Sequence, residues 1–366
     1  MSELSSASGY TKQIDDVDVS DVVFNLPEYV SRRLPMQYPF GGLLNWRRFN
    51  LTIHLWYDLD AQESDEDLEL RAQLTQFGSA AAPEYRLSVW ADTGYGGSTL
   101  NVHIDRIRGL SRWWKIQLLL KSAGISGAQI VRWTPRGKAD DIDSVLVSSS
   151  LEGFPPVDAA IVGGLTRRFA SELVGSAKPL LEGGGEACVW KVYQVGKRDI
   201  ALVSYPYGTL AKHIGQYLGS RSEDLFFVGS CGSFSHHLAK GDVVLPNRLK
   251  CISGVDNTIE NILAGQADLR DSMHLSVYTP LQETGKLVAS SLREGVLTAD
   301  CEASWFAHGV FSGTGRGSRQ LGVALFVTDE AWRSGKGLTD FRYRERTVKL
   351  AGARCVAMVK EALSIR

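Results

Sequence analysis

Four apolar segments that end in turns constrain the fold of the second half of this chain. They are "DAAIVGG" (158–164), "DIALVSYPYG" (199–208), "DLFFVGSCG" (224–232) and "QLGVALFVTD" (320–329). Helical patterns follow the first two, and a long helical pattern closes the chain at 343–365. Apolar strands without alternation, separated by helices, are typical of a mainly parallel sheet covered on both faces. Because ligands bind beyond the carboxyl ends of such strands, we expect a site at these turns.

Residues 1–150 have a different pattern, which predicts a smaller α+β domain. Alternating apolar and polar residues predict strands at 51–58, 84–91, 98–107 and 128–135, and helical spacing predicts a helix at 110–124. Six of the nine tryptophans lie in this part, and we interpret them as an aromatic core. Composition predicts disorder in about the first 20 residues. The segment 143–156 ends in Ser, Gly and Pro, and we place there the boundary with a second domain at 151–366.

The charge and the cysteines exclude several classes of protein. The 366 residues carry a net charge of −1, which gives no reason to expect nucleic acid or an anionic membrane as a partner. No apolar stretch approaches the ~20 residues that span a bilayer, and the polar N-terminus lacks a signal core, so we expect a cytoplasmic protein. The five cysteines are scattered and form no CxxC motif. We therefore predict buried thiols rather than disulfides or a zinc site.

Three strand ends share a glycine turn, in "VGGLTRR", "YPYGT" and "VGSCGS". Glycine lets the backbone turn sharply and approach a ligand closely. Backbone N–H groups, the Ser230 hydroxyl and Arg167 suit phosphate or another oxyanion. His236 and His237 point to opposite faces of an extended chain and have no further ligand nearby, so no metal site is predicted. Cys231 has no assigned base, which favours packing over a nucleophilic role.

Three carboxylates have two interpretations each. Asp300 and Glu302 precede an apolar helix that starts at Ala303, and Asp329 ends a buried strand. Carboxylates in these places stabilise a helix N-terminus. In a functional role, Asp300 and Glu302 accept hydrogen bonds from sugar hydroxyls, and Asp329 donates a proton. The residues alone leave both interpretations open.

The order of these motifs resembles that of the nucleoside phosphorylase and nucleosidase superfamily. "VGSCGSFSHHLAKGDVVLPN" is similar to the family's strand, turn and "GDVV" strand, "ADCEASWFA" to its acidic helix, and "FVTDEAW" to its "VSD" segment. The resemblance covers about residues 157–366. It implies a three-layer α/β/α fold, cleavage of an N-glycosidic bond, and no metal or organic cofactor. It also implies a homo-oligomer, for which we favour a dimer because of the additional N-terminal domain.

The resemblance implies roles for residues that contact the nucleoside. Glu302 is expected to hold the ribose 2′- and 3′-hydroxyls, with Asp300 as the second acidic residue of that motif. Asp329 is expected to protonate the leaving purine. Arg342, thirteen residues later, is expected to assist Asp329, and Arg344 and Arg346 are nearly as eligible. Tyr278 and Tyr207 lie where the family contacts the base or the sugar.

The same resemblance implies a phosphate site, from which the sequence departs. Gly163 and Arg167 match the ends of the phosphate turn, and Ser230 is expected to donate to phosphate or ribose. Phe227 replaces an arginine that the hexameric phosphorylases carry. The turn that approaches the sugar reads Tyr205–Gly208 instead of "GMG", and Cys301 replaces a methionine.

Arg167 is present, whereas the nucleosidases' water-activating Glu is absent. We therefore predict phosphorolysis of a purine nucleoside, with inorganic phosphate as co-substrate. The second hypothesis is a non-catalytic protein that binds a ligand or peptide, with the N-terminal domain as the partner surface.

Overall fold

The structure is a computed structural model that describes most of the second half of the chain and the regular elements of the first. The described residues are 21–23, 26, 50–56, 71–72, 86–94, 97–105, 110–122, 130–133, 146, 149–185, 188–204, 206–312, 320–332 and 344–364. The predicted disordered tail, Tyr205 and Arg342 lie outside these ranges.

A five-stranded sheet forms from the N-terminal residues. Its strands are β1 (Asn50–Trp56), β2 (Arg71–Ala72), β3 (Arg86–Gly94), β4 (Gly97–Asp105) and β5 (Ile130–Trp133), in the order β2-β3-β4-β1-β5. β3 and β4 are antiparallel, whereas β1 is parallel to β4 and β5. β1, β3, β4 and β5 overlap the four predicted strands. The predicted helix is α3 (Leu110–Ser122).

The second sheet has ten strands. They are β6 (Val157–Gly163), β7 (Leu181–Gly184), β8 (Val189–Val195), β9 (Arg198–Ser204), β10 (Ser222–Ser233), β11 (Val243–Cys251), β12 (Asp256–Thr258), β13 (Leu269–Ser276), β14 (Val296–Asp300) and β15 (Gln320–Glu330). β10 pairs with β14 and β15, β15 with β11, β11 with β13, and β13 with β14. These five strands therefore close into a barrel, and β6 to β9 extend from it.

The sheet is mixed: β6, β9, β10 and β15 are parallel, as predicted, but other strand pairs are antiparallel. β8 is antiparallel to both β7 and β9, and β11 is antiparallel to β12 and β15. β8 and β9 are joined by the two-residue turn Gly196–Lys197, in which Gly196 has a φ of 63°. A two-residue loop of this kind joins antiparallel strands.

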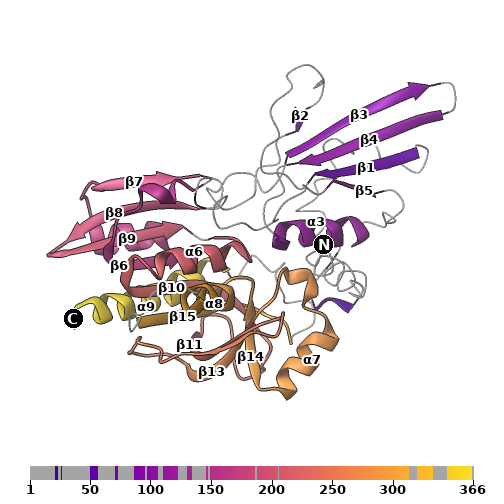
Figure 1. The fold of residues 1–366 in the computed structure, drawn as a ribbon. Helices are drawn as coiled ribbons and strands as arrows, with labels where there is room; N and C mark the ends of the chain where they lie inside the picture. The colour runs from indigo at the N-terminus through magenta and orange to yellow at the C-terminus, as the bar shows by residue number, and fades with distance from the viewer. Residues whose placement is uncertain are drawn as a thin grey trace.

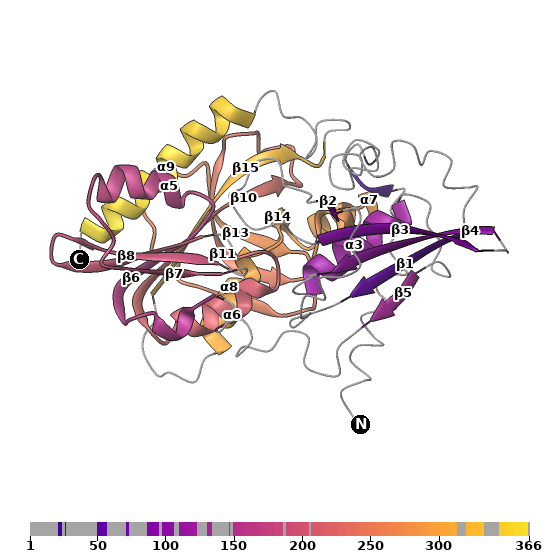
Figure 2. The same cartoon turned by 90° about the horizontal axis from the view of Figure 1, so that it is seen from above.

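Helices cover both faces of the extended sheet, as the sequence predicted. One layer holds α6 (Leu210–Leu218) and α8 (Ala303–Ser312), and the other holds α5 (Thr166–Phe169), its π-helical continuation Ala170–Val174, and α9 (Arg344–Ser364). Figure 2 shows these two layers on opposite sides of the strands. Alternate residues of β10 supply the two cores: Leu225 and Phe227 pack with the first layer, and Phe226 and Val228 with the second.

Helix α3 contributes to the core of the larger fold, although it belongs to the N-terminal part of the sequence. Trp114, Ile116 and the run Leu118–Leu120 share one buried cluster with residues of α6, α8 and β10. In Figure 1, α3 lies between the five-stranded sheet and the larger fold. The short 3-10 helix η6 (Pro280–Gln282), which precedes α7 (Gly285–Arg293), contacts α3. The hydrophobic core therefore continues across the predicted boundary near residue 150.

None of the helices that the structure describes is long and apolar enough to span a membrane. All five cysteines are buried free thiols, as predicted. Burial raises the pKa of Cys188 and of Cys355 to about 12.

Candidate functional site

The strand ends named by the sequence meet at one edge of the sheet. β6 is parallel to β9 and β10, and Gly163 pairs with Ser204 on one side and Val228 on the other. β10 is in turn parallel to β15, where Gly232 pairs with Asp329. Because parallel neighbours end together, the three glycine turns and Asp329 lie along the same edge.

A β-bulge sets the position of Asp329. Cys231 pairs with Val327 and Gly232 with Asp329, so Thr328 is left without a partner in the ladder. A bulge of this kind redirects the following side chain. The Thr328 hydroxyl donates to Asp329 Oδ1 at 2.9 Å and lies 3.3 Å from the Cys231 carbonyl oxygen. Asp329 Oδ2 lies 2.8 Å from the point where a Cβ on Gly232 would stand, so the second glycine of "VGSCG" makes room for this carboxylate.

Glu283, to which no sequence motif points, lies beside Asp329. Its Oε2 is 3.8 Å from the same Cβ point on Gly232. Burial raises the pKa of Glu283 well above its usual value, and the negative charges of Asp329 and Asp300 raise it further. The segment "PLQETG" carries one local signal, Thr284 as the N-cap of α7, and that signal gives Glu283 no role of its own.

Glu302 is bound to the second glycine turn. Its Oε1 accepts from the backbone N–H of Gly208 at 3.0 Å, and Gly208 has a φ of 59°. Burial raises the pKa of the Cys301 thiol, the charges of Glu302 and Glu283 raise it further, and the Lys115 ammonium lowers it. The two glutamates and this lysine therefore share one neighbourhood.

Asp300 is engaged by protein donors. Its carboxylate accepts from the Ser276 hydroxyl at 2.5 Å and from the backbone N–H groups of Glu302 and Ala303 at 3.0 and 2.9 Å. His274 Nε2 lies 2.9 Å from Asp300 Oδ1. This is the helix-terminus arrangement that the sequence left open, and it fixes the start of α8. A role for Asp300 toward a substrate stays a prediction.

Two aromatic contacts bring α3 onto residues predicted to bind substrate. The Tyr278 ring contacts the rings of Trp114 on α3 and Trp305 on α8, at centroid distances of 4.4 and 5.1 Å. The Lys115 ammonium lies over the Tyr207 ring, 4.9 Å from its centroid, and the Lys115 residue is only 3% exposed. Neither residue of α3 was predicted to belong to the site, because its sequence reads only as an aromatic helix.

The residues predicted to bind phosphate differ in how far they are exposed to solvent. Gly163 has a φ of 142°, and a Cβ there would stand 1.9 Å from the Val228 carbonyl oxygen, so glycine is required for packing against β10. Arg167 is exposed and Ser230 is half-buried. Arg168 pairs with Glu172 at 2.5 Å and also donates to the Lys349 carbonyl oxygen. Phe227 is fully buried against Phe306 of α8, so this position faces the helix layer.

Cys231 is packed in the core, whereas the histidine pair lies at the surface. Cys231 is buried, and burial raises the pKa of its thiol well above the usual value, with a smaller contribution from Asp300. It is a packed thiol, as predicted. His236 and His237 are exposed, with ring centroids 3.8 Å apart. Within the described residues, no group of three or more His, Cys, Asp or Glu side chains is arranged to hold a metal ion.

The candidate site is closed in this conformation. Tyr278, Glu283, Glu302 and Asp329 are each 4% exposed or less. Groups this buried have almost no contact with water. Arg346, at the start of α9, is exposed.

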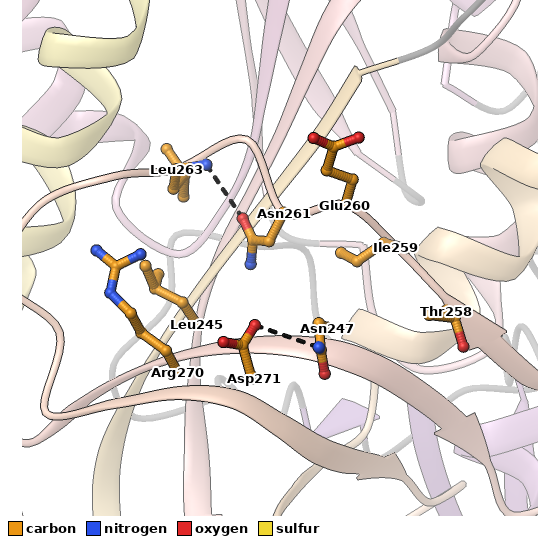
Figure 3. Close-up of a pocket in the computed structure, with 9 residues that line it drawn as sticks. All are labelled: Leu245, Asn247, Thr258, Ile259, Glu260, Asn261, Leu263, Arg270 and Asp271. Atoms are coloured by element: carbon orange, nitrogen blue, oxygen red, sulfur yellow. Dashed lines mark hydrogen bonds between the residues drawn. The ribbon is translucent and has the colours of Figure 1, made fainter.

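A cavity of about 480 Å³ lies elsewhere, along β11 and the first residues of β13. Figure 3 shows Asn247 and Asn261 near its centre, with Arg270 and Asp271 on β13. Asn247 donates to Asp271 at 3.2 Å. None of the predicted site residues lines this cavity.

No protein-family profile matches the chain, and no curated protein matches it. Among solved structures, the chain is similar to a uridine phosphorylase from Vibrio fischeri ES114, with 16% identity, 57% of this chain and 92% of that chain covered, and a TM-score of 0.46. It is also similar to a 5′-methylthioadenosine/S-adenosylhomocysteine nucleosidase from Helicobacter pylori, with 12% identity, 57% and 99% covered, and a TM-score of 0.46.

At these identities the likeness concerns the fold alone.

Proposed function

We propose that this chain cleaves the N-glycosidic bond of a nucleoside at the acidic strand edge. The observation that carries the proposal is the meeting of Asp329 and Glu302 with the glycine turns. Asp329 comes from the end of β15 beside Gly232, and Glu302 reaches the Gly208 turn from the start of α8. A proton donor and a hydroxyl-binding carboxylate on one edge are the groups that this reaction needs.

In the proposed reaction Glu302 holds the ribose hydroxyls, and Asp329 protonates the leaving base as the C1′–N bond breaks. Protonation makes the base a better leaving group from an oxocarbenium-like sugar. A purine is favoured, because Asp329 can reach a ring nitrogen that accepts a proton. Phosphate is favoured over water as nucleophile, because Arg167 and Ser230 both keep accessible surface at the same edge.

Access to this site requires movement of α3 in the proposed mechanism. Trp114 packs on Tyr278 and Lys115 lies over Tyr207, and these contacts occupy the aromatic faces where a base would stack. The conformation described is therefore assigned to the closed state, and substrate binding follows the separation of Trp114 from Tyr278.

The same contacts favour a second candidate function, a non-catalytic binding protein. In that case α3 stays permanently against the aromatic residues of the site. One oxygen of Glu302 already accepts a hydrogen bond from the Gly208 N–H. The N-terminal sheet then presents the partner surface for a peptide or protein.

The deciding experiment is a panel of purine and pyrimidine nucleosides, incubated with and without phosphate, with release of free base measured by chromatography. Release that depends on phosphate and is lost in Asp329→Asn supports phosphorolysis, and release without phosphate supports hydrolysis. Asp271→Asn, on the distant cavity, is the matched control and should retain activity. No release from any nucleoside, together with a thermal shift on adding a peptide, would support the binding protein.

A further inference from the structure

We propose that Glu283 is a positioning residue that shares one proton with Asp329 and so keeps Asp329 able to act as an acid. This inference rests on the proposed function for its catalytic part, whereas the shared proton itself is a property of the folded chain. The sequence resemblance pointed to Arg342 as the helper of Asp329. Arg342 lies outside the described residues, so that role stays a prediction. Among the residues that the structure describes, the geometry points to a carboxylate from a different segment.

The two carboxylates face the same point beside Gly232. Asp329 Oδ2 and Glu283 Oε2 lie 2.8 and 3.8 Å from the place of a Cβ on this glycine. Gly232 has no side chain to separate them, and Asp329 and Glu283 are only 3% and 4% exposed. Two carboxyl groups brought together away from water do not both ionise, since the second charge is repelled by the first where little solvent screens it.

Glu283 is held in place from both sides. Its carbonyl oxygen accepts from Val23 N–H at 3.0 Å, and the preceding Gln282 side chain accepts from Tyr278 N–H at 2.8 Å. Thr284 then caps α7 through Leu287 N–H at 3.2 Å. The backbone on each side of Glu283 is therefore anchored, so its carboxyl group stays at the bulge that positions Asp329.

The charges around Glu283 favour a neutral carboxyl. After burial itself, the negative charges of Asp329 on β15 and Asp300 on β14 raise its pKa. The charge of Glu283 also raises the pKa of the buried thiols of Cys231 and Cys301, so these two groups are near it. Lys115 of α3 acts on Cys301 from the Tyr207 side. The two charges that raise the pKa of Glu283 are thus both negative, and they favour a proton on its carboxyl group.

The proton serves the reaction in one balanced step. The O–H bond of Asp329 breaks as its proton bonds to a ring nitrogen of the base, and the electron pair of the C1′–N bond passes to the base. An oxygen of phosphate bonds to C1′; in hydrolysis the oxygen of water does so instead and releases one proton to solvent. The pair is left with two negative charges, and it regains its proton from solvent after the base departs.

A spectroscopic test does not depend on finding a substrate. The infrared band of a protonated carboxyl is expected in the wild-type protein at pH 7. Glu283→Gln should remove that band, and Asp329→Asn should shift its frequency, because the hydrogen-bond partner of the proton changes. Glu294→Gln, on the surface of the molecule, is the matched control and should leave it unchanged. A Glu283→Gln spectrum identical to that of the wild type would overturn the proposal.

The pH dependence of base release gives the second readout. In Glu283→Gln the amide donates to ionised Asp329, so kcat should fall by about ten-fold or more at pH 7 and recover toward pH 5, with KM little changed. Asp329→Asn should be inactive at both pH values. A uniform loss at all pH values would mean a structural role and would also overturn the proposal. If no variant and no wild type releases base while the infrared results hold, the proposed function fails and the shared proton stands.

Discussion

The Trp114 ring packs on the Tyr278 ring at a centroid distance of 4.4 Å, and this contact joins α3 to the predicted substrate site. Trp114 is 1% exposed and Tyr278 is 2% exposed. A helix from the N-terminal part of the chain thus forms one wall of a site whose acids come from the larger fold.

Replacing Trp114 with alanine is expected to cost about 3–5 kcal/mol of stability, because a large buried ring is removed. It should also uncover Tyr278. Hydrogen exchange of the peptide 276–283, measured by mass spectrometry, should increase. Trp190→Ala is the control, since Trp190 is also buried but packs against Phe154. Similar hydrogen exchange of that peptide in the two variants would show that Trp114 does not cover Tyr278.

Glu283 should make stability depend on pH with a definite sign. In the unfolded chain it ionises near pH 4.3, roughly the value for free glutamate, whereas burial and the nearby Asp329 and Asp300 raise its pKa in the folded protein. Above about pH 4 the folded state then binds more protons than the unfolded state does. The contribution of Glu283 to the stability of the fold is therefore full below that pH and is lost as the pH rises. Glu283→Gln is therefore expected to make the fall in stability with rising pH less steep.

Urea unfolding midpoints between pH 4 and pH 8 measure this effect. Ser291→Ala, a buried and non-titrating change in α7, should lower the curve without changing its slope. A Glu283→Gln curve parallel to that of the wild type would argue against a neutral buried Glu283.

Gly232→Ala is expected to displace the Asp329 carboxylate, because the added Cβ would stand 2.8 Å from Oδ2. Base release should fall by about ten-fold or more, since the proton donor loses its position. Gly153→Ala is the matched control: a Cβ there meets nothing within 4 Å, so both activity and melting temperature should stay near the wild-type values. Full activity in Gly232→Ala would argue against a role for Asp329 as the proton donor.

Phe227→Arg is expected to destabilise the fold rather than restore a phosphate site. The side chain is fully buried against Phe306, and an unpaired charge there costs several kcal/mol. Phe227→Leu, which keeps an apolar side chain, should cost much less. Denaturant midpoints of the two variants measure the difference. A stable Phe227→Arg protein with stronger phosphate binding would show that this position reaches the site.

The thiols should be unreactive in the folded protein. All five cysteines are buried, and burial raises the pKa of Cys188 and Cys355 to about 12, so little thiolate forms at pH 8. A chromogenic disulfide reagent is expected to react slowly with the native chain and to release five equivalents after unfolding in guanidinium. Rapid reaction of one native thiol would point to a cysteine outside the packed core.

The sequence predicted those strands whose residues alone carry a recognisable pattern. β6, β9, β10 and β15 were predicted because each is an apolar segment that ends at a turn, and their glycine turns meet at one edge because parallel strands end together. β8 and β14 were missed, since neither follows a simple pattern and each is defined by its neighbours. The barrel closure was missed for the same reason.

The site was predicted only where a motif carries the chemistry. Asp329 and Glu302 stand next to recognisable segments, whereas Glu283 lies in a helix-capping turn and Lys115 in an aromatic helix. Their contacts join segments far apart in the sequence, Glu283 with Asp329 and Lys115 with Tyr207. The residues next to Glu283 and Lys115 in the sequence give no indication of these distant contacts.

The shared core of α3 has a practical consequence for dissecting the protein. A fragment cut at residue 150 would lose Trp114, Ile116 and Leu118–Leu120 from the cluster that includes Phe227, Tyr278 and Phe306. Its newly bare aromatic surface is the kind that causes aggregation. The smallest well-behaved piece with this acidic edge should therefore begin before α3, and the two halves of the gene are expected to work only when expressed together.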